Sequence, residues 1–334
     1  MPRISTAVIR EAATIHPWLP LLLAENRTIP QSRQELRWLV QEFGSNKSAK
    51  LYNACLERNK HVPLQYILGS QPFGMLDIKC KKGVLIPRWE TEEWCLNLCY
   101  SIRRSNQISS SVGNWKIVDL CTGTGCIPLT VIHETKDVLP SQIRLDIDAI
   151  DCSATAMNLT KLNFKTNFGE SEFLSQTSNV NFNFHKCNIL NERDVSKYLS
   201  QCKNKERINI LTCNPPYITH QEFIKDVRSS VRMYEPKLAL IGNLEFYSNL
   251  CNFWVRKNLI DSFVYEIGNL EQALHVQKNL RKNWISGITY DSDNKPRCVF
   301  GYNNETDIDY STIFNHFEHI AKLYNSTKSN EIRT

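Results

Sequence analysis

Two short segments of the chain carry residue types that could act together on a ligand. Asp119–Cys126 reads Asp-Leu-Cys-Thr-Gly-Thr-Gly-Cys, and Asn214–Tyr217 reads Asn-Pro-Pro-Tyr; each closely follows an apolar run. Glycines in a turn between a strand and a helix let the backbone approach a ligand closely. The two segments therefore predict a binding turn and a rigid polar loop at the ends of strands.

An acidic residue, Asp151, ends the apolar run that follows the turn, 26 residues after Gly125. Beside a glycine turn, a carboxylate in this position can accept hydrogen bonds from ribose hydroxyls. Each feature alone is also compatible with a plain strand–helix connection or a helix cap. The two features together favour a site for a nucleoside cofactor.

The class of nucleoside follows from the residues around the turn. A dinucleotide site uses Gly-x-Gly-x-x-Gly, and the position three after Gly125 is Pro128, which argues against NAD. The acid at Asp119 suits S-adenosylmethionine better, because the cationic sulfonium and amino group of that molecule favour nearby carboxylates and carbonyls.

The segment Asn214–Tyr217 contains the chain's only Pro-Pro pair. Two prolines fix φ twice and withdraw two N–H donors, so the loop is rigid. The side-chain oxygen of Asn214 and the carbonyl of Pro215 can accept both protons of a planar NH2 group, while Tyr217 adds an aromatic wall. Such a loop can aim an amide or amine nitrogen at a methyl donor. The simpler alternative is a strand that merely ends at prolines.

Strands that alternate with helices must position these segments. Alternation of this kind predicts βαβ units and a mainly parallel sheet, that is, an α/β fold. The last two apolar runs lie close together, so we expect an antiparallel hairpin at one edge. The strand candidates are Trp115–Leu120, Leu145–Ile150, Phe182–His185, Ile208–Cys213, Phe263–Ile267, Trp284–Tyr290 and Arg297–Tyr302.

The chain before the sheet divides into a helical region and an extended connector. Gln34–Gln41 and Ala49–Arg58 space their apolar residues by three and four, which is typical of helices. Pro72–Pro87 is extended, and a helix follows from Glu90. We expect a helical domain at 1–72, an extended or hairpin connector and linker at 73–110, the sheet domain at 111–304, and a helix and tail at 305–334, with an amphipathic stretch at Ile313–Leu323.

Composition excludes several classes of protein. The 334 residues are 42% hydrophobic and 22% charged, which is ordinary for a globular protein of about two domains. No apolar run is long enough to cross a membrane. The net charge of +6 contains no Lys/Arg block, so it requires no acidic partner. None of the 12 cysteines form Cys-x-x-Cys, so we expect no metal site and buried thiols in a reducing compartment.

Four ordered segments together resemble the HemK/PrmC family of protein N5-glutamine methyltransferases, over about residues 30 to 302. Two are the turn and Asn214–Tyr217. Leu85–Glu92 is similar to the family's Ile-Pro-Arg-Pro-x-Thr-Glu segment, and Tyr234–Leu240 to its Tyr-Glu-Pro-x-x-Ala-Leu run; Pro63–Gly69 and Glu266 also fit. The resemblance implies a class I methyltransferase fold: a Rossmann-like, mainly parallel seven-stranded sheet with an antiparallel edge hairpin, and a small N-terminal helical domain.

The activity implied by this resemblance is methylation of the glutamine side chain in the Gly-Gly-Gln loop of peptide chain release factors. The resemblance implies that S-adenosylmethionine is held by Thr122, Gly123, Thr124, Gly125, Cys126, Asp151, Asn188 and Asn214. It also implies that the substrate glutamine is held by Asn214, Pro215, Pro216 and Tyr217, with Asn214, Pro215 and Tyr217 as the catalytic group. Arg88 and Glu92 either order the entrance to the site or form a salt-bridged loop.

Three positions depart from the family pattern. Cys121 replaces the usual first glycine, and Trp89 replaces the second proline of the Arg-Pro segment. The glycine-rich stretch after Leu240 is shortened to Gly242-Asn243. None of these changes removes a catalytic group, so we expect them to affect cofactor affinity and substrate fit.

Two other functions stay open on the sequence alone. A DNA or RNA adenine-N6 methyltransferase uses a similar Pro-Pro-Tyr loop, but it needs a basic surface to read and flip its base. A cofactor-binding assembly factor without activity would not need the loop acceptors, which are present. We therefore expect a class I release factor as the partner, with no membrane and no direct nucleic acid binding.

The first residues are basic and contain no acid before Glu11, as in a short amphipathic presequence or a simple first helix. In the family that the chain resembles, organellar members keep the N-terminal helical domain, which cytosolic eukaryotic members generally lack. The match is most similar to the fungal mitochondrial member. We expect a location in the mitochondrial matrix, with the cytoplasm as the alternative.

Overall fold

The structure is a computed structural model that describes residues 3–44, 48–105, 114–138, 140, 143–169, 179–201, 207–317 and 322–325. Most of the polar linker expected around residues 105–113 and the tail after residue 325 lie outside the described residues. Within the described ranges, no helix combines the length and the apolar character needed to cross a membrane.

Helices fill the chain before residue 70, as their amphipathic spacing predicts. Ser5 and Ser48 cap the helices that follow them by accepting a hydrogen bond from a backbone N–H in the first turn. Pro20 and Pro30 occupy first-turn positions, where a missing N–H costs no hydrogen bond. The bounds are α1 (Thr6–Ile15), α2 (Leu19–Asn26), α3 (Ile29–Phe43), α4 (Ala49–Asn59) and α5 (Leu64–Leu68).

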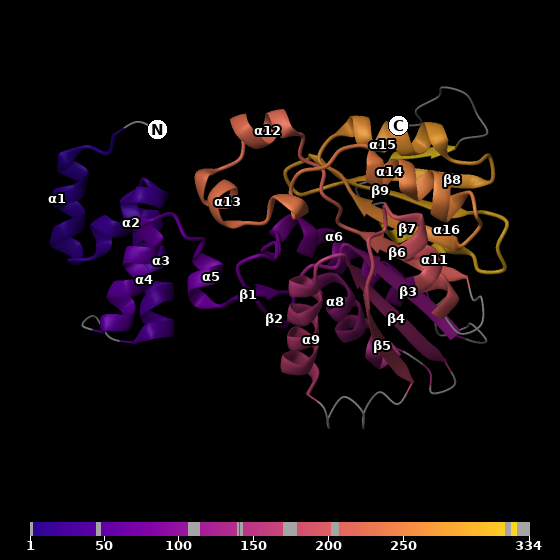
Figure 1. Cartoon of the computed structure of the whole chain (residues 1–334), viewed down its shortest axis with the longest axis horizontal. Coiled ribbons are helices and arrows are strands. Elements are labelled where there is room, and N and C mark those ends of the chain that lie inside the picture. Colours follow the sequence, from indigo (N-terminus) through magenta and orange to yellow (C-terminus); the bar gives the residue numbers. More distant parts are fainter. Residues whose placement is uncertain are drawn as a thin grey trace.

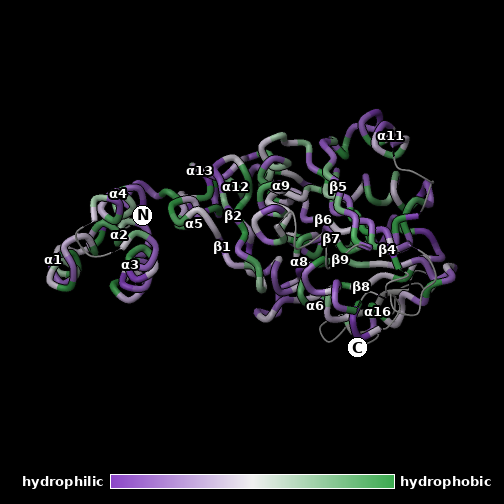
Figure 2. Tube along the Cα trace, turned by 90° about the horizontal axis from the view of Figure 1, so that it is seen from below, coloured by the Kyte–Doolittle hydropathy of each residue, from purple (hydrophilic) through white to green (hydrophobic). Residues whose placement is uncertain are grey.

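These helices share a hydrophobic core of their own, which includes Leu22, Leu39 and Cys55. A buried ion pair joins α3 to α4: the Arg58 guanidinium donates to both carboxylate oxygens of Glu35, at 2.9 and 2.8 Å. The bidentate geometry offsets the cost of burying both charges. Figures 1 and 2 both show α1–α4 set apart from the sheet, on one side of the molecule.

A hairpin and a long helix connect this region to the sheet. Strands β1 (Ser70–Phe73) and β2 (Leu76–Lys79) pair antiparallel around Gly74, whose φ is 57°. Helix α6 (Trp89–Ser105) follows, and Glu92 in its first turn accepts a hydrogen bond from the Gly74 N–H at 2.9 Å. Of the two forms expected for the connector, its start is the hairpin, which begins at Ser70 and is fixed to the start of α6.

The sheet has the order β10-β8-β9-β7-β6-β3-β4-β5. Strands β5, β4, β3, β6 and β7 are parallel neighbours, whereas β9 pairs antiparallel with both β7 and β8. The predicted seven-stranded sheet with its antiparallel hairpin is thus confirmed, and β10 adds a further edge strand. The bounds are β3 (Asn114–Leu120), β4 (Arg144–Asp151), β5 (Val180–Lys186), β6 (Ile208–Cys213), β7 (Ile260–Glu266), β8 (Trp284–Tyr290), β9 (Pro296–Asn303) and β10 (Lys322–Asn325).

Helices cover both faces of the sheet, and Figure 1 shows the layers. Trp115 and Ile117 of β3 share one core with α6, α8 and α16, while Val118 and Leu120 share another with α11, α14, η3 and α15. A doubly wound sheet needs strands that are buried on both faces. The bounds are α8 (Cys126–Thr135), η1 (Lys136–Val138), α9 (Ala154–Phe168), α11 (Glu192–Gln201), α12 (His220–Lys225), α13 (Ser229–Tyr234), η2 (Lys237–Ala239), α14 (Glu245–Asn249), η3 (Leu250–Val255), α15 (Leu270–Asn279) and α16 (Tyr310–Phe317).

The carboxyl-terminal stretch corrects one expectation. Ile313–Leu323 is not one amphipathic element, because α16 ends at Phe317 and β10 pairs antiparallel with β8. Phe314 stacks on Phe300 of β9 with ring centroids 5.0 Å apart, so the helix is held to the sheet beside this edge. Without a further strand, the edge of β8 would leave backbone N–H and C=O groups unpaired, and β10 pairs with them.

Candidate active site

The predicted turn lies at the carboxyl end of β3, where the order of the sheet reverses. The Thr122 N–H donates to the Ile150 carbonyl of β4 at 3.0 Å, and the Gly125 N–H donates back to the Thr122 carbonyl at 2.8 Å. Gly123 and Gly125 have φ values of 58° and 81°, which glycine adopts without strain. In an α/β sheet this reversal is where ligands bind.

Helix α9 holds the turn from below. Thr160 donates to the Gly123 carbonyl at 3.0 Å, and Asn163 donates to the Thr124 carbonyl at 2.9 Å. A Cβ added to Gly125 would lie 2.6 Å from the Thr160 side chain, so only glycine fits against this helix. The backbone of the turn is therefore preorganised before a ligand binds.

Asp151 closes the other side of the turn, as predicted for the acid that ends β4. One carboxylate oxygen accepts the Gly123 N–H at 3.0 Å, and the other accepts the Ser153 N–H at 2.8 Å. Burial raises the pKa of Asp151 above its usual value, and these backbone hydrogen bonds oppose the shift. Asp151 therefore both fixes the glycine turn and borders the cavity beside it.

Asp119 has a different position from the one that the sequence indicated. Its side chain is fully buried and accepts a hydrogen bond from Thr212 at 2.7 Å, and it is not among the residues that line the cavity. Burial raises the pKa of Asp119 to about 7. Asp119 thus supports the end of β3 and does not face a ligand.

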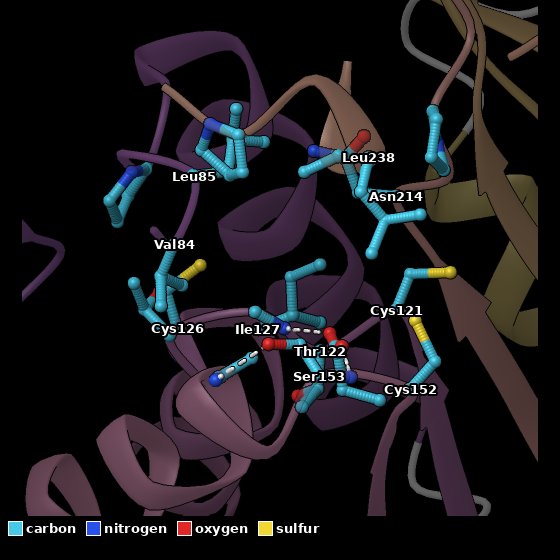
Figure 3. Close-up of a pocket in the computed structure, with 18 of the residues that line it drawn as sticks. Val84, Leu85, Cys121, Thr122, Cys126, Ile127, Cys152, Ser153, Asn214 and Leu238 are labelled. Atoms are coloured by element: carbon cyan, nitrogen blue, oxygen red, sulfur yellow. Dashed lines mark hydrogen bonds between the residues drawn. The ribbon is translucent and has the colours of Figure 1, made fainter. Parts of the chain in front are cut away.

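A cavity opens above the turn, and Figure 3 shows part of its lining. We call it the turn cavity. Seven of the eight residues predicted to hold the cofactor line it; Gly125, packed against α9, does not. The seven are Thr122, Gly123, Thr124, Cys126, Asp151, Asn188 and Asn214.

Asn188 lies at the far end of the turn cavity, after β5. Its side-chain oxygen accepts a hydrogen bond from the Leu190 N–H at 3.1 Å, so the amide is fixed beside the apolar side chains of Ile189 and Leu190. A polar amide next to apolar walls suits a flat base such as adenine. The structure thus places Asn188 in the lining of the turn cavity, and its contact with an adenine ring stays a prediction.

A second cavity adjoins the turn cavity and contains the rest of the predicted loop. We call it the loop cavity. Pro215 and Tyr217 line the loop cavity, whereas Pro216 lines the turn cavity. Asn214 borders both, together with Leu85, Arg88 and Ala239. One residue of the loop therefore faces two compartments.

Two segments, Leu85–Glu92 and Tyr234–Leu240, contribute to the lining of both cavities, and an ion pair joins them. We call these two segments the roof. Glu235, with a side chain only 1% exposed, accepts a hydrogen bond from the Arg88 guanidinium at 2.6 Å and another from the Ile86 N–H at 3.2 Å. Of the two alternatives for Arg88, the salt-bridged loop is confirmed. Glu92 instead binds the β1–β2 turn, as described above.

Tyr217 is held at both ends, so it acts as a fixed wall. Its hydroxyl donates to Glu266 at 3.0 Å, and its backbone carbonyl accepts a hydrogen bond from Gln272 at 3.0 Å. A Cβ added to Gly268 would lie 2.7 Å from the Tyr217 ring, so the ring packs directly on that backbone. The predicted aromatic wall is therefore rigid.

The shortened stretch at Gly242 keeps the one glycine that the loop requires. A Cβ at this position would lie 2.3 Å from the Pro216 carbonyl oxygen, which is closer than two non-bonded atoms can approach. The Gly242 N–H donates to the Ile218 carbonyl at 3.1 Å. The departure from the family pattern therefore leaves the contact with the loop intact.

Cys121 adopts a φ of 56° at the position where the family usually has glycine. A non-glycine residue in this region costs roughly 1–2 kcal/mol, so the turn carries local strain. Cys121 and Cys152 both border the turn cavity, and Figure 3 shows them on the same side of it. Among the 11 described cysteines, all free, nine are buried, which confirms buried thiols at those positions.

We expect Cys121→Gly to stabilise the protein by up to about 1 kcal/mol, because relief of the left-handed strain exceeds the added chain entropy of the unfolded state. Thermal unfolding measures this effect. Cys152→Gly is the matched control: Cys152 is not among the described residues with positive φ, so the same change there should lower the unfolding temperature. A lower unfolding temperature for Cys121→Gly would contradict the strain.

No family model matches the chain. Among curated proteins, the chain is similar to the mitochondrial MRF1 N(5)-glutamine methyltransferase MTQ1 of Saccharomyces cerevisiae, with 44% identity over 308 residues, 90% of this chain and 89% of the relative. A probable mitochondrial MRF1 N(5)-glutamine methyltransferase of Schizosaccharomyces pombe is 34% identical over 322 residues, covering 90% and 96%. A release factor glutamine methyltransferase of Bifidobacterium longum is 30% identical over 224 residues, covering 66% and 68%.

Proposed function

The chain belongs to the family of release factor N5-glutamine methyltransferases, and on this premise we propose that it transfers a methyl group from S-adenosylmethionine to the glutamine side chain in the Gly-Gly-Gln motif of a mitochondrial peptide chain release factor. The enzyme is a protein-glutamine methyltransferase that depends on S-adenosylmethionine. Methylation of a release factor modifies a protein that acts in translation termination.

One observation carries the proposal: Asn214 borders both the turn cavity and the loop cavity. A methyltransferase must bring a methyl donor and a methyl acceptor together in line, and two adjoining compartments that share the Asn214 side chain supply this arrangement. The loop cavity is bounded by Pro215 and Tyr217, which leave a rigid slot with a carbonyl and an aromatic wall. A planar glutamine amide matches that slot.

The residues of the turn cavity fit S-adenosylmethionine. Gly123 and Gly125 have backbone conformations that bring the chain close to a ligand, and the Asp151 carboxylate lies beside them for ribose hydroxyls. Apolar side chains such as Val84 and Ile189 line the remainder and suit an adenine ring. When bound, S-adenosylmethionine supplies an electrophilic methyl group on its sulfonium sulfur.

The chain's own residues then need only to hold the glutamine amide, which is the methyl acceptor, and to polarise it. The Asn214 side-chain oxygen and the Pro215 carbonyl accept the two N–H groups of the glutamine amide and aim its nitrogen at the turn cavity. These hydrogen bonds push electron density onto a nitrogen whose lone pair is delocalised. Alignment alone can lower such a barrier by up to roughly 7–11 kcal/mol. The protonated amide that results is acidic, so its proton passes to solvent without a dedicated base.

We infer that the helices before residue 70 recognise the protein substrate. Among described residues 3–72, none lines either cavity, and these helices have a separate core. Hydrogen bonds join them to the segments around the site: for example, Tyr234 donates to the Lys60 carbonyl at 2.8 Å, and Tyr66 donates to the Val84 carbonyl at 2.7 Å. The helical region therefore stands beside the loop cavity as a docking surface.

A variant that starts at Val62 tests this division of labour, because it keeps α5 and the bond from Tyr66 to Val84. We expect its affinity for S-adenosylmethionine to stay near the full-length value, while turnover on an intact release factor falls on the order of tenfold or more. Turnover on a short Gly-Gly-Gln peptide is the control and should change little. Equal losses on the peptide and the intact factor would contradict a docking role.

We infer a location in the mitochondrial matrix. The two yeast relatives are mitochondrial by name. Arg10, one of the two basic residues before Glu11, lies in α1, whose Ala12 is fully buried in the helical core. Protease protection in isolated mitochondria measures the location; digestion while the membranes are intact would contradict it.

Incubation with methyl-labelled S-adenosylmethionine and, separately, an intact mitochondrial release factor, DNA and RNA tests the proposed function. Label should enter the release factor and should disappear when the glutamine of Gly-Gly-Gln is replaced. Label in adenine of DNA or RNA, with none in the protein, would favour an adenine methyltransferase instead.

A further inference from the structure

A buried carboxylate lies behind the Asn-Pro-Pro-Tyr loop and receives three hydrogen bonds. Glu266 ends β7, beside the end of β6 where the loop starts, and it is 1% exposed. Its Oε1 accepts the Tyr217 hydroxyl at 3.0 Å. Its Oε2 accepts the Thr91 hydroxyl at 2.7 Å and the Trp94 indole N–H at 2.8 Å. Glu266 therefore acts only as an acceptor at this position.

The direction of these hydrogen bonds follows from the ionised form of Glu266. Burial raises the pKa of Glu266, and the hydrogen bonds from Trp94, Thr91 and Tyr217 oppose this shift by stabilising the carboxylate. An indole N–H can only donate and an ionised carboxylate can only accept, so the Oε2 atom of Glu266 has donors on both sides. The Thr91 hydroxyl has one proton, which it gives to Glu266. Its oxygen also lies 3.2 Å from the Asn214 Nδ2 atom. Towards Asn214, Thr91 can therefore act only as an acceptor.

This constraint selects one of two orientations of the Asn214 amide. The oxygen and nitrogen of an asparagine amide have nearly the same size, so packing alone distinguishes them poorly. Because Thr91 must accept, the NH2 group of Asn214 faces Thr91, and Oδ1 lies on the opposite side of the amide. In the flipped orientation, two acceptors would face each other at Thr91, and the NH2 group would take the place of Oδ1.

We propose that Thr91 and Glu266 are positioning residues that lock the Asn214 amide with its oxygen towards the substrate glutamine. The inference rests on the proposed function, because a glutamine NH2 group needs an acceptor at Asn214 and would meet a second donor if the amide were flipped. Glu266 acts on Asn214 through Thr91 and touches neither substrate nor cofactor itself.

The same carboxylate also fixes the far end of the loop. Glu266 binds Tyr217 directly and Asn214 through Thr91, while two prolines make the backbone between them rigid. Thr91 belongs to α6, Asn214 follows β6 and Glu266 ends β7, so three separate elements meet at one acceptor. The loop is therefore locked in both its backbone and its hydrogen-bond direction.

Thr91→Val and Thr91→Ser form a matched pair that tests the proposal in the full-length enzyme. Valine keeps the shape of threonine and removes the hydroxyl, so the Asn214 amide loses its directing acceptor. We expect kcat on the release factor to fall roughly 10-fold to 100-fold, with a smaller change in KM. Serine restores the hydroxyl and should restore most of kcat. Calorimetric affinity for S-adenosylmethionine and the unfolding temperature report separately on cofactor binding and folding.

A double-mutant cycle separates positioning from a general structural effect. If Thr91 acts through Asn214, Thr91→Val should cause no further loss of kcat in the Asn214→Ala background. Fully additive losses would overturn the proposal, as would equal turnover of Thr91→Val and Thr91→Ser in a wild-type background.

Glu266→Gln tests whether kcat depends on the direction of the hydrogen bonds at Thr91 or on the negative charge of Glu266. The Trp94 N–H requires an acceptor at the Oε2 position, so the glutamine carbonyl should occupy it and preserve the direction at Thr91. We expect Glu266→Gln to retain more kcat than Thr91→Val, and the reverse order would contradict the proposal. Wild-type enzyme that transfers no methyl group to the release factor would instead refute the proposed function, so the two failures are distinguishable.

Discussion

Replacing Asn214 by alanine should lower kcat for methylation of the release factor by about 10²–10³-fold, the usual effect of removing one preorganised polar contact at a reacting group. Asn214 is the residue of the loop that borders both the turn cavity and the loop cavity, and its amide supplies the side-chain acceptor of the loop. Binding of the release factor should change much less, because docking uses a broad surface. Single-turnover assays with labelled methyl donor, together with binding titrations, separate the two effects.

Asn214→Asp is the sharper companion variant. It keeps the shape and an acceptor, but it loses the donor that the Thr91 oxygen requires and adds a charge close to the buried Glu266. We therefore expect it to be about as impaired as the alanine variant. Near-normal turnover of Asn214→Ala on a glutamine-containing factor would refute the amide-binding mechanism, and a loss confined to DNA would support the adenine alternative.

Replacing Asp151 by alanine should weaken S-adenosylmethionine binding by about 1.5–3 kcal/mol, or roughly ten- to hundredfold in Kd, which corresponds to lost charge-assisted hydrogen bonds. The side chain borders the turn cavity and also accepts the N–H groups of Gly123 and Ser153. Loss of the carboxylate therefore removes a ligand contact and loosens the glycine turn. Calorimetric titration measures the affinity, and circular dichroism checks the fold.

Asp119→Asn is the matched control, because this second acid is the penultimate residue of the neighbouring strand β3 but is buried and outside the lining of the turn cavity. Asparagine keeps an acceptor for Thr212, so affinity should stay near the wild-type value. Unchanged affinity in Asp151→Ala would remove Asp151 from the site. A loss in Asp119→Asn alone would reverse the roles of the two acids.

The central strands of the sheet could be predicted because each is a short, largely apolar run buried on both faces. Trp115–Leu120 and Ile208–Cys213 lie within one residue of the observed strands β3 and β6. The edge strand β10 was harder to predict, because an edge strand forms where another strand leaves backbone groups unpaired. Lys322–Asn325 becomes β10 for this reason, and its own sequence resembles the end of an amphipathic helix.

The turn and the loop of the site could also be predicted, since glycines and prolines act on the backbone locally. The two acids could not be told apart in the same way. Asp119 and Asp151 both lie near a strand end that precedes a turn, and only tertiary packing buries the first under the sheet edge and leaves the second beside the cavity.

The supporting hydrogen bonds were beyond the reach of sequence patterns, because their partners are far apart in the chain. Glu235 and Arg88 are 147 residues apart, and Thr91 and Asn214 are 123 apart. No spacing rule connects such pairs. Only the resemblance to a family marked both segments of the roof, and it did not indicate that Glu235 joins them.

The most direct test of the central claim is mass spectrometry of a mitochondrial release factor after incubation with the full-length enzyme and S-adenosylmethionine. Fragment ions should place one added methyl group on the side-chain nitrogen of the glutamine in Gly-Gly-Gln, and the Asn214→Ala enzyme should leave the same peptide unmodified. A methyl group on any other residue, or an unmodified factor alongside methylated adenine in added DNA or RNA, would contradict it.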